Sequence, residues 1–330
     1  MKNSNFLNII KNKMGDDILK NICTFIIPIY IYENRQLNYL RNTIEGIINQ
    51  SDENWIAIFI NDCSPIQEVD DFINNYRKCD KRINLLSLKK RISTGECRNI
   101  GIRWAANQGS EFILYNDADD ISHPKRVEIT KKLFKEHTNI GVVYSGISVI
   151  DENNEIIEYK NISNPIKEII NSLEKYPPQG NNSFLHMGIV SGYTNVTSAT
   201  SVRTEIALRE LFPDEYISED MHTWYRYGAI TEFYYYKNLK TKYRVPSYTV
   251  RQNSEIYTTD FSRDKVRVDI DGFYKALEKY KHTESICSDE LHLLKSKFLL
   301  KLSESLGLEK RYDLAFKVAM QAKKEINNID

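Results

Sequence analysis

The sequence predicts an α/β fold with a mixed, mainly parallel sheet flanked by helices and a helical C-terminal extension. The first half of the 330-residue chain alternates short apolar runs with segments of helical spacing. Polar or acidic residues follow three of these runs, as expected where the strands of a parallel sheet end at a ligand site. From about residue 260 onward, Gly and Pro nearly vanish and helical periodicity dominates.

Four apolar runs in the first half are predicted as buried strands. They are residues 23–30 (CTFIIPIY), 55–64 (WIAIFINDCS), 83–88 (INLLSL) and 111–117 (EFILYND). Helical spacing between them predicts helices over 37–48 and 69–78. A further helix is expected to open with a capping box, Ser93 with Glu96 three residues later. Buried strands that alternate with helices indicate a mainly parallel sheet covered on both faces.

The second half is less regular. Residues 141–161 predict two strands joined by an Asn-rich turn, and 195–207 are expected to return to the sheet. Residues 218–229 predict the start of a helix with Ser218 as its N-cap. We expect a main α/β domain over 1–255, in which 1–21 form an N-terminal flank, and a helical C-terminal extension over 256–330.

The composition excludes several classes of protein. Lys plus Arg and Asp plus Glu both number 45, so the net charge is zero and no overall field attracts nucleic acid. The five cysteines are scattered without a C-x-x-C pair, which fits a reducing compartment. No apolar run is long enough for a signal peptide or a membrane span. We therefore expect a cytoplasmic protein without a transmembrane segment, for which peripheral membrane contact stays open.

Three carboxylates lie at and just after the end of the fourth predicted strand: Asp117, Asp119 and Asp120. Like charges at a strand end repel one another, and a bound divalent cation is the simplest group that makes the arrangement favourable. Oxygen ligands alone select Mg²⁺ or Mn²⁺, which usually share substrate phosphates. A solvated turn before Pro124 is the plainer alternative, and it would prevail if the short D-x-D pattern stood alone.

The pattern is accompanied by other motifs, which together resemble the family 2 glycosyltransferases of the GT-A fold. In order they are FIIPIY, FINDCSP, STGECRNIGIRWA, YNDADD and ISEDMHTWYRYG. The resemblance runs from about Cys23 to Tyr248. It implies a GT-A (Rossmann-like) fold and an inverting transferase of the hexosyl or N-acetylhexosaminyl type. Its substrates would be a nucleoside-diphosphate sugar and a glycan or other hydroxyl acceptor, in surface glycan or glycoconjugate biosynthesis.

The resemblance also implies a donor site. Its nucleotide-binding residues would be Pro28, Tyr30, Glu33, Asp62, Arg98, Asn116, Asp117, Ala118 and Arg251. Asp62 matches the residue that contacts the base, which favours uridine. Asp119 would bind Mn²⁺ or Mg²⁺, and Asp117 the ribose or the metal and its waters. Asp120 would extend the site toward the donor sugar. For Arg98 and Arg251, the simpler alternative to nucleotide binding is an ordinary position on the surface.

The last motif supplies the expected catalytic pair. Asp220 would act as the general base toward the acceptor hydroxyl, and Glu219 would orient the acceptor or the base. Both residues also suit the first turn of a helix, where the dipole favours acidic side chains. His222 could contact acceptor or metal, although packing is its more ordinary role.

Two other functions stay open at this point. A nucleotidyltransferase could share an acidic cluster, but the segment FIIPIYIYENRQ is no triphosphate loop. A non-catalytic nucleotide-sugar-binding module would not need Asp117, Asp119 and Asp220 intact. The C-terminal helices could pair subunits in a homo-oligomer, touch a membrane or pack on the catalytic domain.

Overall fold

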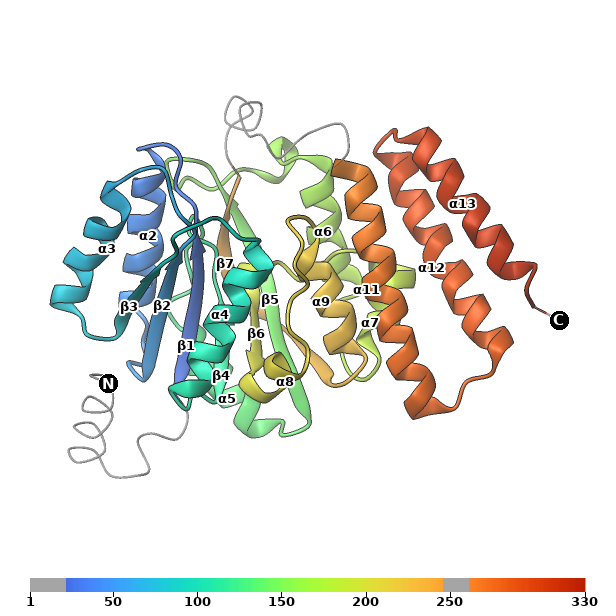
Figure 1. The fold of residues 1–330 in the computed structure, drawn as a ribbon, viewed down its shortest axis with the longest axis horizontal. Helices are drawn as coiled ribbons and strands as arrows, with labels where there is room; N and C mark the ends of the chain where they lie inside the picture. Colours follow the sequence, from blue (N-terminus) through green and yellow to red (C-terminus); the bar gives the residue numbers. More distant parts are fainter. Residues whose placement is uncertain (1–21, 246–260, 330) are drawn as a thin grey trace.

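The computed structural model describes residues 22–245 and 261–329, whose centre is a seven-stranded sheet in the order β3-β2-β1-β4-β6-β5-β7 (Figure 1). The strands are β1 (Cys23–Ile29), β2 (Trp55–Asn61), β3 (Ile83–Ser87), β4 (Phe112–Tyr115), β5 (Ile140–Ile150), β6 (Thr200–Arg203) and β7 (Glu232–Arg244). Only β6 among them runs antiparallel to its neighbours. The sheet is therefore mixed and mainly parallel, as predicted.

The strands are buried because helices cover both faces of the sheet. In β1, Phe25 and Ile27 pack with one group of apolar residues and Ile26 with the other, as the strand's period of two requires. The first group includes residues of α2 (Gln36–Ile48), α3 (Glu68–Cys79) and α5 (Arg126–Glu136). The second includes residues of α4 (Thr94–Asn107), α7 (Ser183–His186), α8 (Thr204–Arg209) and α9 (Glu219–Gly228).

The C-terminal helices share this second core. They are α11 (Phe261–Glu284), α12 (Ser288–Leu308) and α13 (Tyr312–Ile326), and α12 and α13 form one end of the molecule (Figure 1). Phe273 of α11 stacks on Phe298 of α12 with ring centroids 4.0 Å apart, and Tyr225 of α9 meets both rings edge-on. An aromatic cluster thus joins the extension to the helix that carries the predicted catalytic pair.

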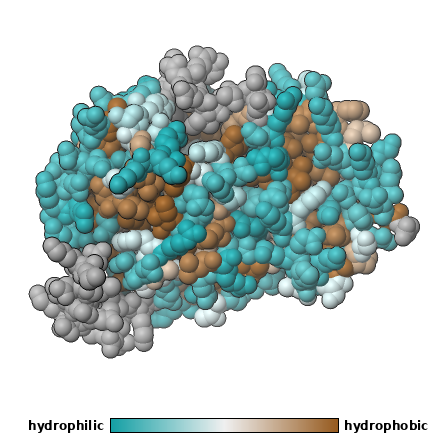
Figure 2. All heavy atoms as spheres, viewed as in Figure 1, coloured by the Kyte–Doolittle hydropathy of each residue, from teal (hydrophilic) through white to brown (hydrophobic). Residues whose placement is uncertain are grey.

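Between β5 and β6 the chain forms α6 (Asn164–Lys175), α7 and three short helical turns. The turns are η1 (Tyr159–Asn161), η2 (Met187–Ser191) and η3 (Thr197–Ala199). No helix within residues 22–245 and 261–329 combines the length and the apolar character that crossing a membrane requires. On the face shown in Figure 2, hydrophilic residues cover most of the described surface and apolar residues gather in separate patches.

The four strands predicted in the first half are confirmed as β1 to β4. The prediction of two strands over 141–161 was wrong, because β5 continues only to Ile150. The Asp151 carboxylate then accepts hydrogen bonds from the backbone of Asn153 and Glu155, and Ile156 makes only an isolated bridge to Ile150. Strand β7, on the far edge beside β5, was not predicted.

The capping box forms only in part. Ser93 Oγ accepts a hydrogen bond from Glu96 N at 3.2 Å and so caps α4. The Glu96 carboxylate instead accepts from Asn99 Nδ2 at 2.8 Å. The predicted boundary between the main domain and the C-terminal extension, at residues 255 and 256, lies outside the described residues and stays a prediction.

Candidate active site

The carboxyl ends of β1, β2 and β4 meet at one edge of the sheet. Asp62 N donates to Ile29 O at 2.8 Å, and Asn116 N donates to Ile26 O at 3.1 Å. Strand β1 lies between β2 and β4, so the order of the strands reverses here, which is the position where open α/β sheets bind ligands. The side chains that follow these strands therefore lie near one another, as the sequence predicted.

Tyr30 and Asp62 stand on the β1–β2 side of this edge with Arg91, which the sequence reasoning missed. The Arg91 guanidinium lies 3.6 Å from the centroid of the Tyr30 ring, and its Nε lies 3.7 Å from Asp62 Oδ2. Asp62 Oδ1 accepts a hydrogen bond from Ile92 N at 2.8 Å. Burial raises the pKa of Asp62, while Ile92 N and Arg91 act against the shift. The group combines an aromatic face with a partly paired carboxylate, which suits a nucleobase.

Pro28 and Glu33 are the other two residues predicted to border the base. Pro28 is half-buried within β1. Glu33 is half-buried and forms an ion pair with Arg35. Within residues 22–245 and 261–329, Glu33 makes no hydrogen bond or ion pair with Tyr30 or Asp62, and its place beside the base stays a prediction.

Side chains from several elements hold the backbone of the turn after β4. Asn116 Nδ2 donates to Asp117 O at 2.8 Å, and Asp117 N donates to Ser198 Oγ at 2.9 Å. Ala118 O accepts from the Thr43 hydroxyl. The backbone oxygen of Asp119 accepts from Nε of Arg244, at the end of β7, at 2.8 Å. These bonds fix the turn through its backbone and leave the Asp119 carboxylate without a side-chain donor within the described residues.

Asp120 is buried against the end of β7. Its side chain is 1% exposed, and Oδ1 accepts a hydrogen bond from Arg244 N at 2.7 Å. Burial and then the charges of Asp119 and Asp117 raise the pKa of Asp120 well above its ordinary value. Asp120 thus ties β7 to the turn, and its expected extension toward the sugar has no support in this geometry.

Arg98 joins the two acidic motifs. Its guanidinium is 3% exposed, and it donates from Nη1 to Glu219 Oε1 at 2.5 Å and from Nη2 to Asp117 Oδ1 at 2.9 Å. Burial alone would lower the pKa of Arg98, but the charges of Asp117, Glu219 and Asp220 raise it above its ordinary value. The predicted nucleotide-side arginine therefore holds carboxylates from β4 and α9 in one site.

Asp220 receives hydrogen bonds from three directions. Oδ2 accepts from the Tyr193 hydroxyl at 2.6 Å and from Thr197 Oγ1 at 3.2 Å, while Oδ1 accepts from Met221 N at 2.7 Å. Burial raises the pKa of Asp220, and the bond from Tyr193 partly opposes that shift. A raised pKa makes a carboxylate a better proton acceptor, so this position suits a general base.

Helix α9 begins without the predicted cap. Ser218 stands at the N-cap position, but its φ is +56° and its side chain makes no capping bond. Ser218 Oγ instead donates to Asp269 Oδ1 of α11 at 2.5 Å. The left-handed residue turns the chain so that Glu219 and Asp220 start the helix inside the site.

His222 lies on the other side of α9. It is 2% exposed, its Nε2 lies 2.7 Å from Asp271 Oδ2, and its Nδ1 accepts from Arg226 Nε at 3.1 Å. Both ring nitrogens therefore have protein partners, and the geometry gives His222 a packing role. Arg251 lies outside the described residues.

The Asp117–Asp119 pair can be tested for its fit to a divalent cation. Within residues 22–245 and 261–329, no group of three or more His, Cys, Asp or Glu is placed to hold a metal ion. Two carboxylates are present, and burial followed by the charge of Asp117 raises the pKa of Asp119 to about 6. Oxygen donors of this kind fit Mg²⁺ or Mn²⁺, provided that phosphates and water supply the other ligands.

Sequence reasoning missed four residues that shape this site: Arg91, Tyr193, Thr197 and Arg244. Arg91 precedes the capping box closely enough to have been considered. The contacts of the other three depend on chain segments that meet only in the fold.

Sequence comparison identifies relatives of this chain. The sequence model of "Glycosyl transferase family 2" matches residues 24–199. An uncharacterized glycosyltransferase of Methanocaldococcus jannaschii is 26% identical over 266 residues, 78% of this chain and 79% of the relative. An uncharacterized glycosyltransferase of Haemophilus influenzae is 26% identical over 228 residues, 66% of this chain and 64% of the relative.

Solved structures agree on the fold. The crystal structure of S. aureus TarS 1-349 in complex with UDP-GlcNAc superposes with a TM-score of 0.57 at 12% identity, covering 92% of both chains. The fold, the order of the motifs and the matched residues lead to one conclusion: the chain belongs to glycosyl transferase family 2 and is a glycosyltransferase with a GT-A-like fold.

Proposed function

We propose that this glycosyltransferase is metal-dependent and inverting, and that it moves a sugar from a UDP-sugar to a hydroxyl acceptor. The observation that carries the proposal is the Arg98 bridge, which brings Asp117 and the Glu219–Asp220 pair into one site. The first motif then serves the departing diphosphate and the second the attacking hydroxyl.

The chain's residues can divide the reaction between them. Asp220 takes the proton of the acceptor hydroxyl as that oxygen attacks the anomeric carbon. The bond from this carbon to the diphosphate oxygen breaks on the opposite face, so the configuration inverts. Tyr193 and Thr197 hold the Asp220 carboxylate, and Glu219 and Arg98 keep it beside the donor. A divalent cation held by Asp119 and Asp117 would neutralise charge on the leaving diphosphate.

Uridine is the proposed base because Asp62 and Tyr30 stand together at the strand ends with Arg91. The TarS fragment, which has a similar fold, was crystallised with UDP and with UDP-GlcNAc, and this supports the choice. We place the reaction in surface glycan or glycoconjugate assembly in the cytoplasm. The support for that compartment is that all five cysteines are free.

Calorimetry tests the donor site directly. UDP and GDP are titrated into the wild type and Asp119→Ala, each with Mn²⁺ and with EDTA. The proposal requires UDP binding that depends on both the metal and Asp119. Asp264→Ala is the matched control, because Asp264 is an exposed aspartate of α11. Metal-independent binding would reject the metal role, and binding of neither nucleotide would reject the donor assignment.

A further inference from the structure

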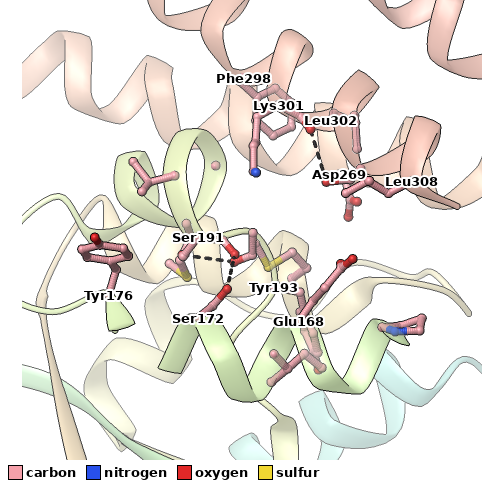
Figure 3. A pocket seen from close by; sticks show the side chains of 18 of the residues that line it. Glu168, Ser172, Tyr176, Ser191, Tyr193, Asp269, Phe298, Lys301, Leu302 and Leu308 are labelled. Carbon is pink, nitrogen blue, oxygen red and sulfur yellow. Dashed lines mark hydrogen bonds between the residues drawn. The ribbon is translucent and has the colours of Figure 1, made fainter. Parts of the chain in front are cut away.

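A cavity of about 430 Å³ lies beside Asp220 and away from the donor residues. Its walls come from α6, η2, the first turns of α9, and helices α11 and α12 (Figure 3). Tyr30, Asp62, Asp117 and Asp119 are all absent from its lining. The volume falls in the range of small-ligand sites, roughly 300–1,000 Å³.

The cavity shares a wall with the candidate base. Tyr193 lines the cavity and donates from its hydroxyl to Asp220 Oδ2 at 2.6 Å. Met221, the next residue after Asp220, lines it as well. On the other side, Glu219 accepts from Arg98, which holds Asp117. Glu219 and Asp220 are themselves outside the lining, so Tyr193 and Met221 form the link between the cavity and the candidate base.

The charges of the lining balance. Three lysines, Lys175, Lys265 and Lys301, face three carboxylates, Glu168, Asp269 and Glu309, which leaves a net charge of 3 − 3 = 0. Lys265 Nζ is already bound to Asp269 Oδ2 at 2.5 Å. An anionic ligand would meet as many negative as positive groups. Sugar hydroxyls both donate and accept hydrogen bonds, so groups of either sign can bind a neutral glycan.

The remaining lining suits sugar rings. Aromatic rings offer flat apolar faces, and Tyr176 and Tyr193 line the cavity. Tyr225 and Phe298 also line it, but they are 4% and 2% exposed because they pack against each other. Hydroxyl and amide groups stand between them at Ser172, Ser305 and Asn171. In Figure 3, Lys301 and Phe298 of α12 face Ser172 and Glu168 of α6 across the space. Tyr176 is 64% exposed and Val190 50% exposed, so they mark the mouth, from which a longer ligand can extend.

We propose that this cavity is the acceptor subsite and that it binds a neutral oligosaccharide, with α12 of the C-terminal extension as one wall. The acceptor role rests on the proposed function of Asp220. The extension is then part of substrate recognition as well as of the core.

Two pairs of variants test the cavity without altering the acidic pair. Tyr176→Ala removes an aromatic face at the mouth, and Val190→Trp fills it. Their controls are Tyr312→Ala and Leu300→Trp, at sites 66% and 53% exposed that are outside the lining. Matched residue types and exposures separate an effect on the cavity from a general effect on folding.

The probes are neutral tetrasaccharides of glucose, galactose, mannose or N-acetylglucosamine, with a sulfated tetrasaccharide as the anionic comparison. Saturation-transfer NMR on the full chain measures the binding of each probe. At least one neutral probe should bind the wild type and both controls. Tyr176→Ala and Val190→Trp should weaken that binding about tenfold or more, which corresponds to about 1.4 kcal/mol.

UDP titration of the same proteins separates the two proposals. UDP binding should be equal in the wild type and all four variants. No binding of any neutral probe, tighter binding of the sulfated probe, or equal binding by wild type and cavity variants would overturn the acceptor subsite. Failure of UDP to bind the wild type would instead remove the proposed function, and the acceptor role with it.

Discussion

Arg98 Nη1 donates a hydrogen bond to Glu219 Oε1 at 2.5 Å, between residues 121 positions apart in the chain. This contact connects α4 to the start of α9 within the site. Both side chains are nearly buried, so each charge depends on the other for compensation.

Arg98→Ala should destabilise the protein by about 3–5 kcal/mol, because it leaves the buried Glu219 carboxylate without its partner. Urea unfolding measures the change. Arg103→Ala, at an exposed position of the same helix, should change stability little. Adding Glu219→Gln to Arg98→Ala should restore part of the loss, and simple additivity of the two substitutions would contradict the coupling.

Asp220→Asn should lower kcat by about 100- to 10,000-fold, since it removes the general base. The amide can still accept from Tyr193, so folding and UDP affinity should be retained. Sugar transfer and calorimetry measure the two effects, with Asp264→Asn as the exposed control. Retained turnover in Asp220→Asn would assign the base to another residue.

Substitutions of Asp119 and Asp120 should have different effects although the two residues are adjacent. Asp120→Ala removes the acceptor for Arg244 N and should cost about 1–3 kcal/mol of stability, whereas Asp120→Asn keeps an acceptor and should cost less. Neither should alter the metal dependence of UDP binding. Asp119→Asn should instead leave the stability nearly unchanged in thermal unfolding and should weaken metal binding in a metal titration. A change in metal affinity in Asp120→Asn would contradict the structural role.

Acid should destabilise the protein through His222. Burial, and then the charge of Arg226, lower the pKa of His222 from 6.5 to about 4. The unfolded state therefore binds this proton more readily than the folded state. The stability that neutral His222 contributes to the fold is complete above pH 6.5 and declines as the pH falls toward 4. The loss amounts to about 3 kcal/mol at most, from 1.36 kcal/mol per pKa unit.

Unfolding free energies between pH 7 and 4 measure that decline. His222→Gln should flatten it, because the replacement does not titrate. His282→Gln, at an exposed position, should follow the wild-type curve. Equal slopes for wild type and His222→Gln would assign the acid sensitivity to carboxylates.

Two glycines should respond oppositely to alanine. A Cβ on Gly228 would lie 2.7 Å from Phe184 N, a backbone atom that has little room to move, so Gly228→Ala should cost about 1–3 kcal/mol. A Cβ on Gly307 meets no described atom within 4 Å, and Gly307 lies within α12. Gly307→Ala should therefore stabilise by about 0.5–1 kcal/mol through helix propensity. Thermal unfolding compares the two, and destabilisation by both would contradict the prediction.

The first half of the fold was predictable because its signals are local. Apolar runs mark β1 to β4, and the turn residues after them place Asp62 and Asp117 at one edge once the strands are parallel. The same reasoning failed at residues 151–156, where the Asp151 side chain binds the backbone and ends the strand pattern.

The supports of the site were not predictable from local patterns. Tyr193 reaches Asp220 across 27 positions, and Arg244 reaches Asp120 across 124. Ser218 resembles a helix cap in sequence but adopts a left-handed conformation and binds Asp269 instead. Each contact depends on where separate elements pack, which the spacing of residues within one element does not encode.

The ring stack of Phe273 on Phe298, with Tyr225 against both, limits how relatives of this enzyme can be recombined. A chimera joined just before α11 would pair one parent's α9 with foreign rings, and the turn that carries Asp220 would shift with its helix. A crossover placed before α6 instead transfers the cavity walls of α6 and η2, the acidic pair, its aromatic support and α12 together. Exchange of acceptor preference between such enzymes would therefore require the longer graft.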